Sequence, residues 1–313
     1  MHGELLQLDG ESDEEVTEIM IKNVNLPNGE TIFYRERSGG DKNVLLVHGN
    51  MNSSKHWDVV LENMDPKYKL YAIDQRGFGL SSYRNPIYSI KELADDIDQF
   101  TKAIELKDFS IIGWSMGGAV SIQYAADHPE ICDKMILLAS CSTRGYPLYE
   151  LDEKGMPDLK RRVETYAQTK SEKAKVITTE QAYATKNREL LRMICDAVIY
   201  TKNKPDPERY EEYIDDILTQ RNYAEILHAL NTFNISQTCN GLVEGTGEAE
   251  KINIPTLVLL GDRDLVITRK MNEEILDDIG ANAKLLELKD CGHSPLIDDL
   301  EQLLHLMSEF LDR

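Results

Sequence analysis

Short apolar runs rich in branched residues alternate along the chain with stretches whose apolar positions have helical spacing. The runs predict buried strands at 43–48, 69–74, 108–113, 131–139, 255–261 and 283–288. The helical spacing predicts helices near 54–64, 89–105, 116–128, 269–279 and 296–312. Because strands that alternate with helices build a mostly parallel sheet covered on both faces, the chain is predicted to have an α/β fold.

Two segments depart from this alternation. Near the N-terminus, strand-like runs at 16–24 and 31–36 flank Pro27-Asn28-Gly29, which predicts a β-hairpin. From 142 to 251 the sequence is rich in Lys, Glu, Arg and Tyr and shows no clear buried strand. Helical spacing near 158–170, 179–199, 207–219 and 222–232 predicts a helical insertion there, within a core made of 18–141 and 252–313.

Composition narrows the classes of function. The chain has 35 Lys and Arg against 55 Asp and Glu, a formal charge of −20, which disfavours nonspecific binding to nucleic acid or anionic membranes. No apolar run is long enough to insert into a membrane as a spanning helix. Residues 1–17 form an acidic leader without the features of a secretion signal. Reduced thiols in a cytoplasmic protein are the expected state of the five scattered cysteines, Cys132, Cys141, Cys195, Cys239 and Cys291.

Gly113-Trp114-Ser115-Met116-Gly117 is the most informative stretch for chemistry, because it lies between a predicted strand and a predicted helix. This G-x-S-x-G pattern describes a nucleophile elbow, a sharp turn that exposes a serine hydroxyl to a base. Helix N–H groups behind Ser115 favour a developing oxyanion.

Partners for the serine follow in the order expected of such an elbow, acid first and histidine second, each after a later strand. His293, after the strand that ends near Leu288, is the predicted base. Asp264, after the strand that ends at Leu260, is the predicted acid, with Asp262 as the alternative. No further histidine or carboxylate cluster accompanies this Asp-x-Asp, so no metal is predicted.

An oxyanion hole needs the N–H that follows the nucleophile and a second N–H from an early loop. Met116 supplies the first of these, and Asn50, which follows His48-Gly49 at a strand end, supplies the second. His48 is then a structural residue that holds the loop.

These motifs, together with Asp74-Gln-Arg-Gly-Phe-Gly-Leu-Ser81, resemble the α/β-hydrolases of the esterase, haloperoxidase and lyase type over 18–140 and 252–313. The resemblance implies that the insertion is a cap over the substrate pocket and that 74–81 is a structural loop. The pair His48 to Ser54 and Gly113 to Gly118 also resembles bacillus-type intracellular polyhydroxybutyrate depolymerases.

The predicted function is ester hydrolysis through an acyl-enzyme, on a small ester or a short hydroxyalkanoate polyester, which would bring a polymer granule surface as a partner. Met51, Trp114 and Tyr146 are candidate pocket residues. No cofactor is predicted, because no Gly-x-Gly-x-x-Gly follows a strand. Cleavage of a carbon–carbon bond by the same fold, and a catalytically inactive binding protein, are the alternatives.

Overall fold

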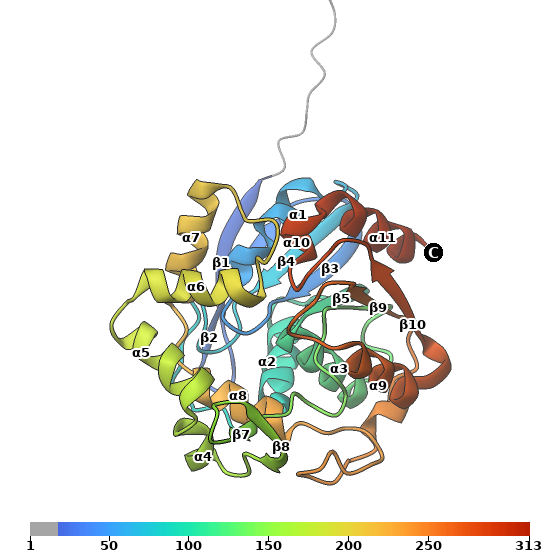
Figure 1. The fold of residues 1–313 in the computed structure, drawn as a ribbon. Helices are drawn as coiled ribbons and strands as arrows, with labels where there is room; N and C mark the ends of the chain where they lie inside the picture. The colour runs from blue at the N-terminus through green and yellow to red at the C-terminus, as the bar shows by residue number, and fades with distance from the viewer. Residues whose placement is uncertain (1–17) are drawn as a thin grey trace, which may run out of the picture.

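A computed structural model describes residues 18–313, and the predicted leader over 1–17 lies outside the described residues. Figure 1 shows the main sheet, whose strand order is β1-β2-β4-β3-β5-β6-β9-β10. Its strands are β1 (Ile19–Asn25), β2 (Thr31–Arg37), β3 (Lys42–Val47), β4 (Tyr68–Ile73), β5 (Phe109–Trp114), β6 (Met135–Leu138), β9 (Thr256–Gly261) and β10 (Ala283–Leu288). The pairs β1–β2 and β2–β4 are antiparallel and the other pairs are parallel, so the predicted α/β fold is confirmed.

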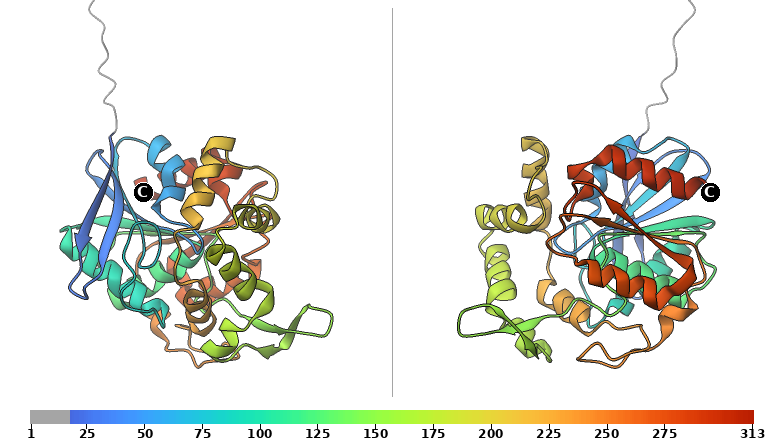
Figure 2. Two further views of the ribbon diagram at one scale, coloured as in Figure 1. Left: turned by 90° about the vertical axis from the view of Figure 1, so that its left-hand side faces the viewer. Right: turned by 45° about the vertical axis from the view of Figure 1, so that its right-hand side comes forward.

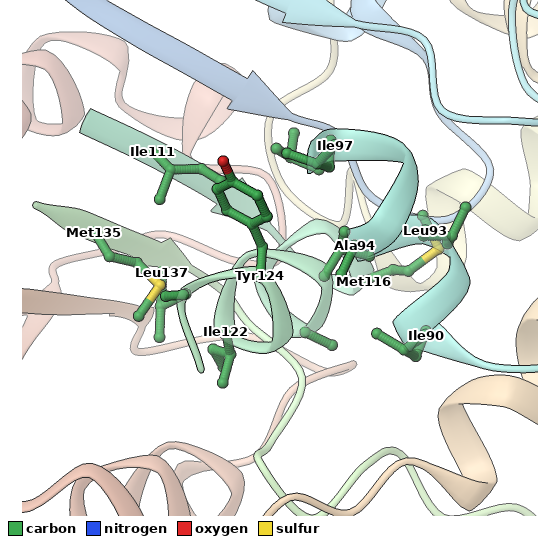
Figure 3. Packing of buried hydrophobic residues seen from close by; sticks show 14 of the residues in the cluster. Ile90, Leu93, Ala94, Ile97, Ile111, Met116, Ile122, Tyr124, Met135 and Leu137 are labelled. Atoms are coloured by element: carbon green, nitrogen blue, oxygen red, sulfur yellow. The ribbon is translucent and has the colours of Figure 1, made fainter. Parts of the chain in front are cut away.

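Helices cover both faces of this sheet, as the two views in Figure 2 show. One face carries α2 (Ile90–Ala103), α3 (Met116–Asp127) and α9 (Arg269–Ile279), and the other carries α1 (Asp58–Asn63), α10 (Pro295–Asp298) and α11 (Leu300–Asp312). Short 3-10 turns precede α1 at Ser54–Trp57 and follow α9 at Gly280–Asn282. Figure 3 shows buried residues of the first face, with Leu93 and Ala94 of α2 beside Met116 at the start of α3.

The centre of the sheet places the loops that carry the candidate site. β3 lies between β4 and β5, so the chain leaves β3 toward one edge of the sheet and β5 toward the other. This is a topological switch point, where the loops at the carboxyl ends of parallel strands diverge and leave a crevice. Val47 at the end of β3 pairs with Gly113 near the end of β5, so the loops that follow the two strands begin side by side.

The segment that joins the neighbouring strands β6 and β9 includes the predicted insertion over 142–251. Its elements are β7 (Tyr149–Leu151), β8 (Pro157–Arg162), α4 (Tyr166–Lys170), a π-helix (Lys173–Ile177), α5 (Thr178–Ala184), α6 (Arg188–Val198), α7 (Pro207–Ile217), α8 (Tyr223–Thr232) and a 3-10 turn (Glu248–Lys251). In Figure 2, α5, α6 and α7 stand apart from the layers of the sheet and its helices. The predicted helices near 207–219 and 222–232 are confirmed as α7 and α8.

Two of the predicted helices in the insertion are partly wrong. The first half of 158–170 is the strand β8, because the Asp152 side chain accepts N–H bonds from Lys154 and Met156 and turns the chain back onto β7. The helix α4 begins only after Thr165, whose side chain caps it. The predicted helix 179–199 is divided at Lys186, which has a φ of 50°.

Within residues 18–313, no helix combines the length and the apolar character that crossing a lipid bilayer requires.

Candidate active site

Ser115 lies between β5 and α3 in a backbone conformation that few residues other than glycine adopt, with φ of 56° and ψ of −117°. The turn is tight because its flanking glycines allow close packing. A Cβ at Gly113 would lie 2.3 Å from the carbonyl oxygen of Gly117, and one at Gly117 would lie 2.2 Å from that of Val47. The glycine spacing therefore holds the serine at the carboxyl edge of the sheet, as an elbow requires.

Three side chains from distant loops meet at this turn in a hydrogen-bonded series. His293 Nε2 lies 3.1 Å from Ser115 Oγ, and His293 Nδ1 lies 3.0 Å from Asp264 Oδ2. The side chains of His293 and Asp264 are 6% and 1% exposed. Because both imidazole nitrogens are engaged, the ring is oriented to take a proton from the serine and to share its charge with the carboxylate.

The loop after β9 places Asp264, rather than Asp262, beside His293. The second carboxylate oxygen of Asp264, Oδ1, accepts N–H bonds from Val266 at 2.7 Å and Ile267 at 2.9 Å, which fixes the carboxylate in place. Asp262 is exposed to solvent. The structure thus brings Asp264, and not the alternative, to the histidine.

The loop that carries His293 is anchored on several sides. The indole N–H of Trp114 donates to the His293 carbonyl at 2.9 Å, and the Gly292 N–H donates to Asp298 at 2.6 Å. Arg263 donates to Asp290 at the start of the same loop. These bonds hold the imidazole near Ser115 independently of the bond between the two side chains.

The two predicted oxyanion donors lie beside the serine. Asn50 and Ser115 line the same pocket, and a Cβ at Gly49 would lie 3.1 Å from the Cβ of Ser115. Among the described residues, neither the Asn50 N–H nor the Met116 N–H donates to a protein acceptor. Met116 directs its side chain into the core beneath α2 (Figure 3), so its contribution to the site is the backbone N–H.

His48 is a buried histidine that holds the Asn50 loop and does not reach the serine. Its Nε2 accepts the Gln75 N–H at 3.0 Å, so Nδ1 carries the proton and donates to the Gly49 carbonyl at 2.7 Å. Burial lowers the pKa of His48 to about 4. The ring is therefore neutral at physiological pH, consistent with the structural role expected from the sequence.

A cavity of about 440 Å³ opens at Ser115, and most of its wall is apolar. Met51 and Tyr146 line it as predicted. The insertion contributes apolar side chains and several polar groups to the same wall, namely Ala174, Lys175, Thr178, Thr179, Ile194, Ala197, Val198, Ile199, Tyr223, Leu227 and Leu230. The Lys175 ammonium lies 3.4 Å from the Tyr146 hydroxyl and 5.0 Å from the centre of its ring. The volume is within the range typical of small-molecule sites.

The prediction that Trp114 lines this pocket is wrong. Successive side chains of a strand point to opposite faces of the sheet, and Trp114 shares with Ile112 the face that carries α1 and α11. It is 2% exposed and meets Trp57 edge to face, with ring centres 6.1 Å apart. Trp114 reaches the site through its N–H bond to the His293 carbonyl and through its ring, whose centre lies 6.1 Å from that of the imidazole.

The cysteines are unpaired, and those near the site are poor nucleophiles. Cys141 lines the pocket, and burial raises its pKa to about 12. Burial likewise raises the pKa values of Cys132, Cys195 and Cys291 to about 12. Because the thiolate is the reactive form, these thiols are inert at neutral pH. Cys239 is exposed and lies outside the pocket wall.

Gln220 is the site residue that sequence reasoning missed. It follows α7, is 4% exposed, and bonds to both Asn50 and Met51 in the loop that carries the second predicted oxyanion donor. No motif surrounds it, and a glutamine near the end of a charged helix is expected to lie on the surface. Only the fold brings it to the site.

Comparison with known proteins places this geometry in a family. The family model described as alpha/beta hydrolase fold matches residues 42–300, well over half of the chain. The protein therefore belongs to the α/β-hydrolase family.

Individual relatives are distant in sequence but similar in extent. AB hydrolase superfamily protein YisY of Bacillus subtilis is 22% identical over 90% of this chain and 95% of its own length. Lipase 3 of Moraxella is 24% identical over 95% of this chain and 86% of its own length. Among solved structures, an esterase from Exiguobacterium antarcticum superposes with a TM-score of 0.72 and 18% identity, covering 94% of this chain and all of that one. At this identity the structural likeness concerns the fold.

Proposed function

We propose that the protein is a serine hydrolase that cleaves carboxylic esters by way of an acyl-enzyme. The observation that carries the proposal is the hydrogen-bonded series of Ser115, His293 and Asp264 at the floor of an apolar pocket. A lipase and an esterase among the relatives and structural neighbours support ester hydrolysis in general.

The reaction has two halves. In the first, His293 takes the proton of the Ser115 hydroxyl as Oγ attacks the ester carbonyl, and the negative charge that develops on the carbonyl oxygen is bound by the N–H groups of Asn50 and Met116. His293 then protonates the leaving alcohol as the ester bond breaks. In the second half, His293 deprotonates a water molecule, which attacks the acyl-enzyme and releases the acid and the free serine. Asp264 holds the imidazole and stabilises its protonated form.

The insertion over 142–251 acts in this proposal as a cap over the pocket, with the core made of 18–141 and 252–313. Side chains of α5, α6 and α8 form much of the pocket wall, so they contact whatever acyl or alcohol group lies next to Ser115. Substrate choice then depends on the insertion, whereas the chemistry depends on the core.

We propose a short hydroxyalkanoate polyester or oligomer as the substrate, which makes the surface of a polymer granule a candidate partner. The resemblance of the elbow and of the loop after β3 to intracellular polyhydroxybutyrate depolymerases supports this choice. Hydroxyl groups of Tyr146, Thr178 and Thr179 among apolar side chains also suit a chain that alternates methyl groups with ester oxygens.

The general proposal is tested with p-nitrophenyl butyrate and a fluorophosphonate probe, with Ser115→Ala as the control. We expect turnover and labelling at Ser115 in the wild type, and a loss of kcat of about 10⁶-fold in the variant. A wild-type protein that neither turns over esters nor reacts with the probe would contradict the proposal and favour an inactive binding protein.

The substrate is tested separately on amorphous polyhydroxybutyrate granules by measuring released 3-hydroxybutyrate. Release by the wild type and not by Ser115→Ala supports the polyester. Turnover of the nitrophenyl ester without release from granules would restrict the function to small esters.

A further inference from the structure

The side chain of Gln220 joins the insertion to the loop that carries the second oxyanion donor. Its Nε2 donates to Asn50 Oδ1 at 2.7 Å and to Asn222 Oδ1 at 3.1 Å. Its Oε1 accepts the Met51 N–H at 3.1 Å and the Tyr183 hydroxyl at 3.0 Å. Both N–H groups and both lone pairs of the amide are engaged, so the side chain has a single orientation.

The donors around Oε1 fix that orientation. A backbone N–H is always a donor, and burial raises the pKa of Tyr183 well above that of an ordinary tyrosine, which keeps its hydroxyl protonated. The oxygen of Gln220 must therefore face Met51 and Tyr183, and the amide nitrogen must face Asn50.

The loop that Gln220 contacts needs support on this side. Met51 has a φ of 64°, a left-handed conformation that is unfavourable for a residue with a side chain. On the other side, the Gln75 side chain donates to the His48 carbonyl at 2.8 Å. The Asn50 N–H therefore lies between a support from the core and a support from the insertion.

Gln220 is itself anchored to the core through its neighbours. The Asn222 side chain donates to the Arg76 carbonyl at 2.9 Å, and the Arg221 N–H donates to the Gly77 carbonyl at 3.0 Å. These bonds hold the segment after α7 against the loop 74–81. That loop has no part in the proposed reaction, and the contacts give it a function in placing the site.

We propose that Gln220 is a positioning residue that holds the Asn50 N–H where the oxyanion develops. The inference rests on the proposed ester hydrolysis and extends it, because it makes the insertion part of the oxyanion machinery as well as part of the pocket wall. A donor displaced by about 1 Å loses much of its effect on the transition state while substrate binding in the pocket is retained.

The test is Gln220→Met, which keeps the length and bulk of the side chain and removes its hydrogen bonds. With p-nitrophenyl butyrate we expect kcat to fall by about 10–100-fold, less than the 10²–10³-fold typical of a deleted donor, and KM to change less than about threefold. A trifluoromethyl ketone forms an oxyanion with the serine, so its inhibition constant should weaken by the same factor as kcat/KM. Tyr183→Phe removes one bond to Gln220, and we expect a smaller loss of the same kind.

Asn231→Leu is the matched control, because Asn231 is another buried amide of the insertion. It accepts the Leu148 N–H at 2.8 Å and donates to the Val163 carbonyl at 2.6 Å, within the insertion. We expect its kcat and inhibition constant to stay within about threefold of wild type. If Gln220→Met retains wild-type kcat and inhibitor affinity, the inference is wrong.

Hydrogen exchange separates this inference from the proposed function. Loss of the Gln220 bond should speed exchange of the Met51 amide in Gln220→Met and leave it unchanged in Asn231→Leu, whether or not the protein hydrolyses esters. A wild type without esterase activity contradicts the proposed function, whereas unchanged Met51 exchange in Gln220→Met contradicts the role of Gln220 as a support.

Discussion

In the main sheet, β5, β6 and β9 bury every side chain, whereas α5, α6 and α7 of the insertion each bury one face. Within the insertion, α8 packs Ile226, Ala229 and Leu230 into the main hydrophobic cluster of the core. The contacts that join α7 and the segment before it to the core are largely polar. Ser53 donates to Asp216 at 2.6 Å, Arg209 bonds to Asp58 at 2.8 Å, and Asn203 donates to the Asp298 carbonyl at 2.9 Å. The core and α8 are therefore held by apolar packing, whereas α7 is held to the core by hydrogen bonds and ion pairs.

This difference assigns separate tasks to the two regions. Close packing keeps the carboxyl ends of β5, β9 and β10 at fixed distances, so the side chains of Ser115, Asp264 and His293 meet with little freedom. Directional polar contacts help to fix where α7 lies, and the pocket wall comes mainly from α5, α6 and α8. A pocket wall can then be altered without moving the serine or the histidine.

The largest expected effect lies in the core. Asp264→Asn should lower kcat by about 10⁴-fold, because the amide stabilises the wrong tautomer of His293 and cannot balance its charge. Asp262→Asn, two residues away and exposed, should stay within about twofold. Steady-state kinetics on one chromogenic ester compares the two, and a larger loss in Asp262→Asn would reassign the acid.

A pair of buried leucines tests the difference in packing. Leu259 in β9 and Leu191 in α6 are both 0% exposed. Leu259→Ala should lower the free energy of unfolding by about 3–5 kcal/mol, since the sheet and its helices cannot close the cavity. Leu191→Ala should cost about 2 kcal/mol, near the low end of the range, because α6 lies in an outer layer that can shift. If urea denaturation gives equal losses of unfolding free energy for the two variants, the insertion is as rigid as the core.

The buried His48 makes the free energy of unfolding depend on pH. Its pKa falls from 6.5 to about 4 in the folded protein because of burial, so below pH 6.5 the unfolded chain binds a proton that the folded chain does not. The stability contribution, about 3 kcal/mol, is present at neutral pH and is lost as the pH falls from 6.5 toward 4.

The measurement is urea denaturation across this interval for the wild type and for His48→Gln. The variant should lose less stability between pH 6.5 and 4 than the wild type does. Parallel curves would mean that His48 binds its proton equally well in the folded state.

The smallest effect is expected for an exposed ion pair between the insertion and the loop that carries His293. Lys202 forms an ion pair with Asp290, and their side chains are 50% and 62% exposed. Exposed pairs contribute less than about 1 kcal/mol, so Lys202→Ala should change kcat, KM and stability very little. A loss of kcat above about tenfold would show that the insertion also orients His293.

The sheet and the meeting of the three candidate catalytic side chains were predictable because each rests on a local pattern with a fixed place in the fold. Ser115, Asp264 and His293 follow strands whose apolar runs are unmistakable, and their order along the chain is set by the family. Trp114 was misplaced because it adjoins the nucleophile in sequence, although the alternation that buries Ile112 points Trp114 to the same face.

The insertion was less predictable because its first part contains a two-stranded hairpin whose strands are largely exposed and lack a buried apolar run. Nothing in the run from Tyr149 to Arg162 distinguishes a hairpin from a helix except the turn around Gly155. Gln220 could not be predicted for a different reason, since its role depends on contacts with residues about 170 positions away.

The distribution of thiols has a practical consequence. Of the five cysteines, only Cys239 is exposed, in the segment between α8 and the 3-10 turn before β9. A maleimide dye or a solid support should therefore attach to the native chain at one place, outside the wall of the candidate pocket. The unmodified chain can therefore be labelled for single-molecule observation, or immobilised, through this one cysteine.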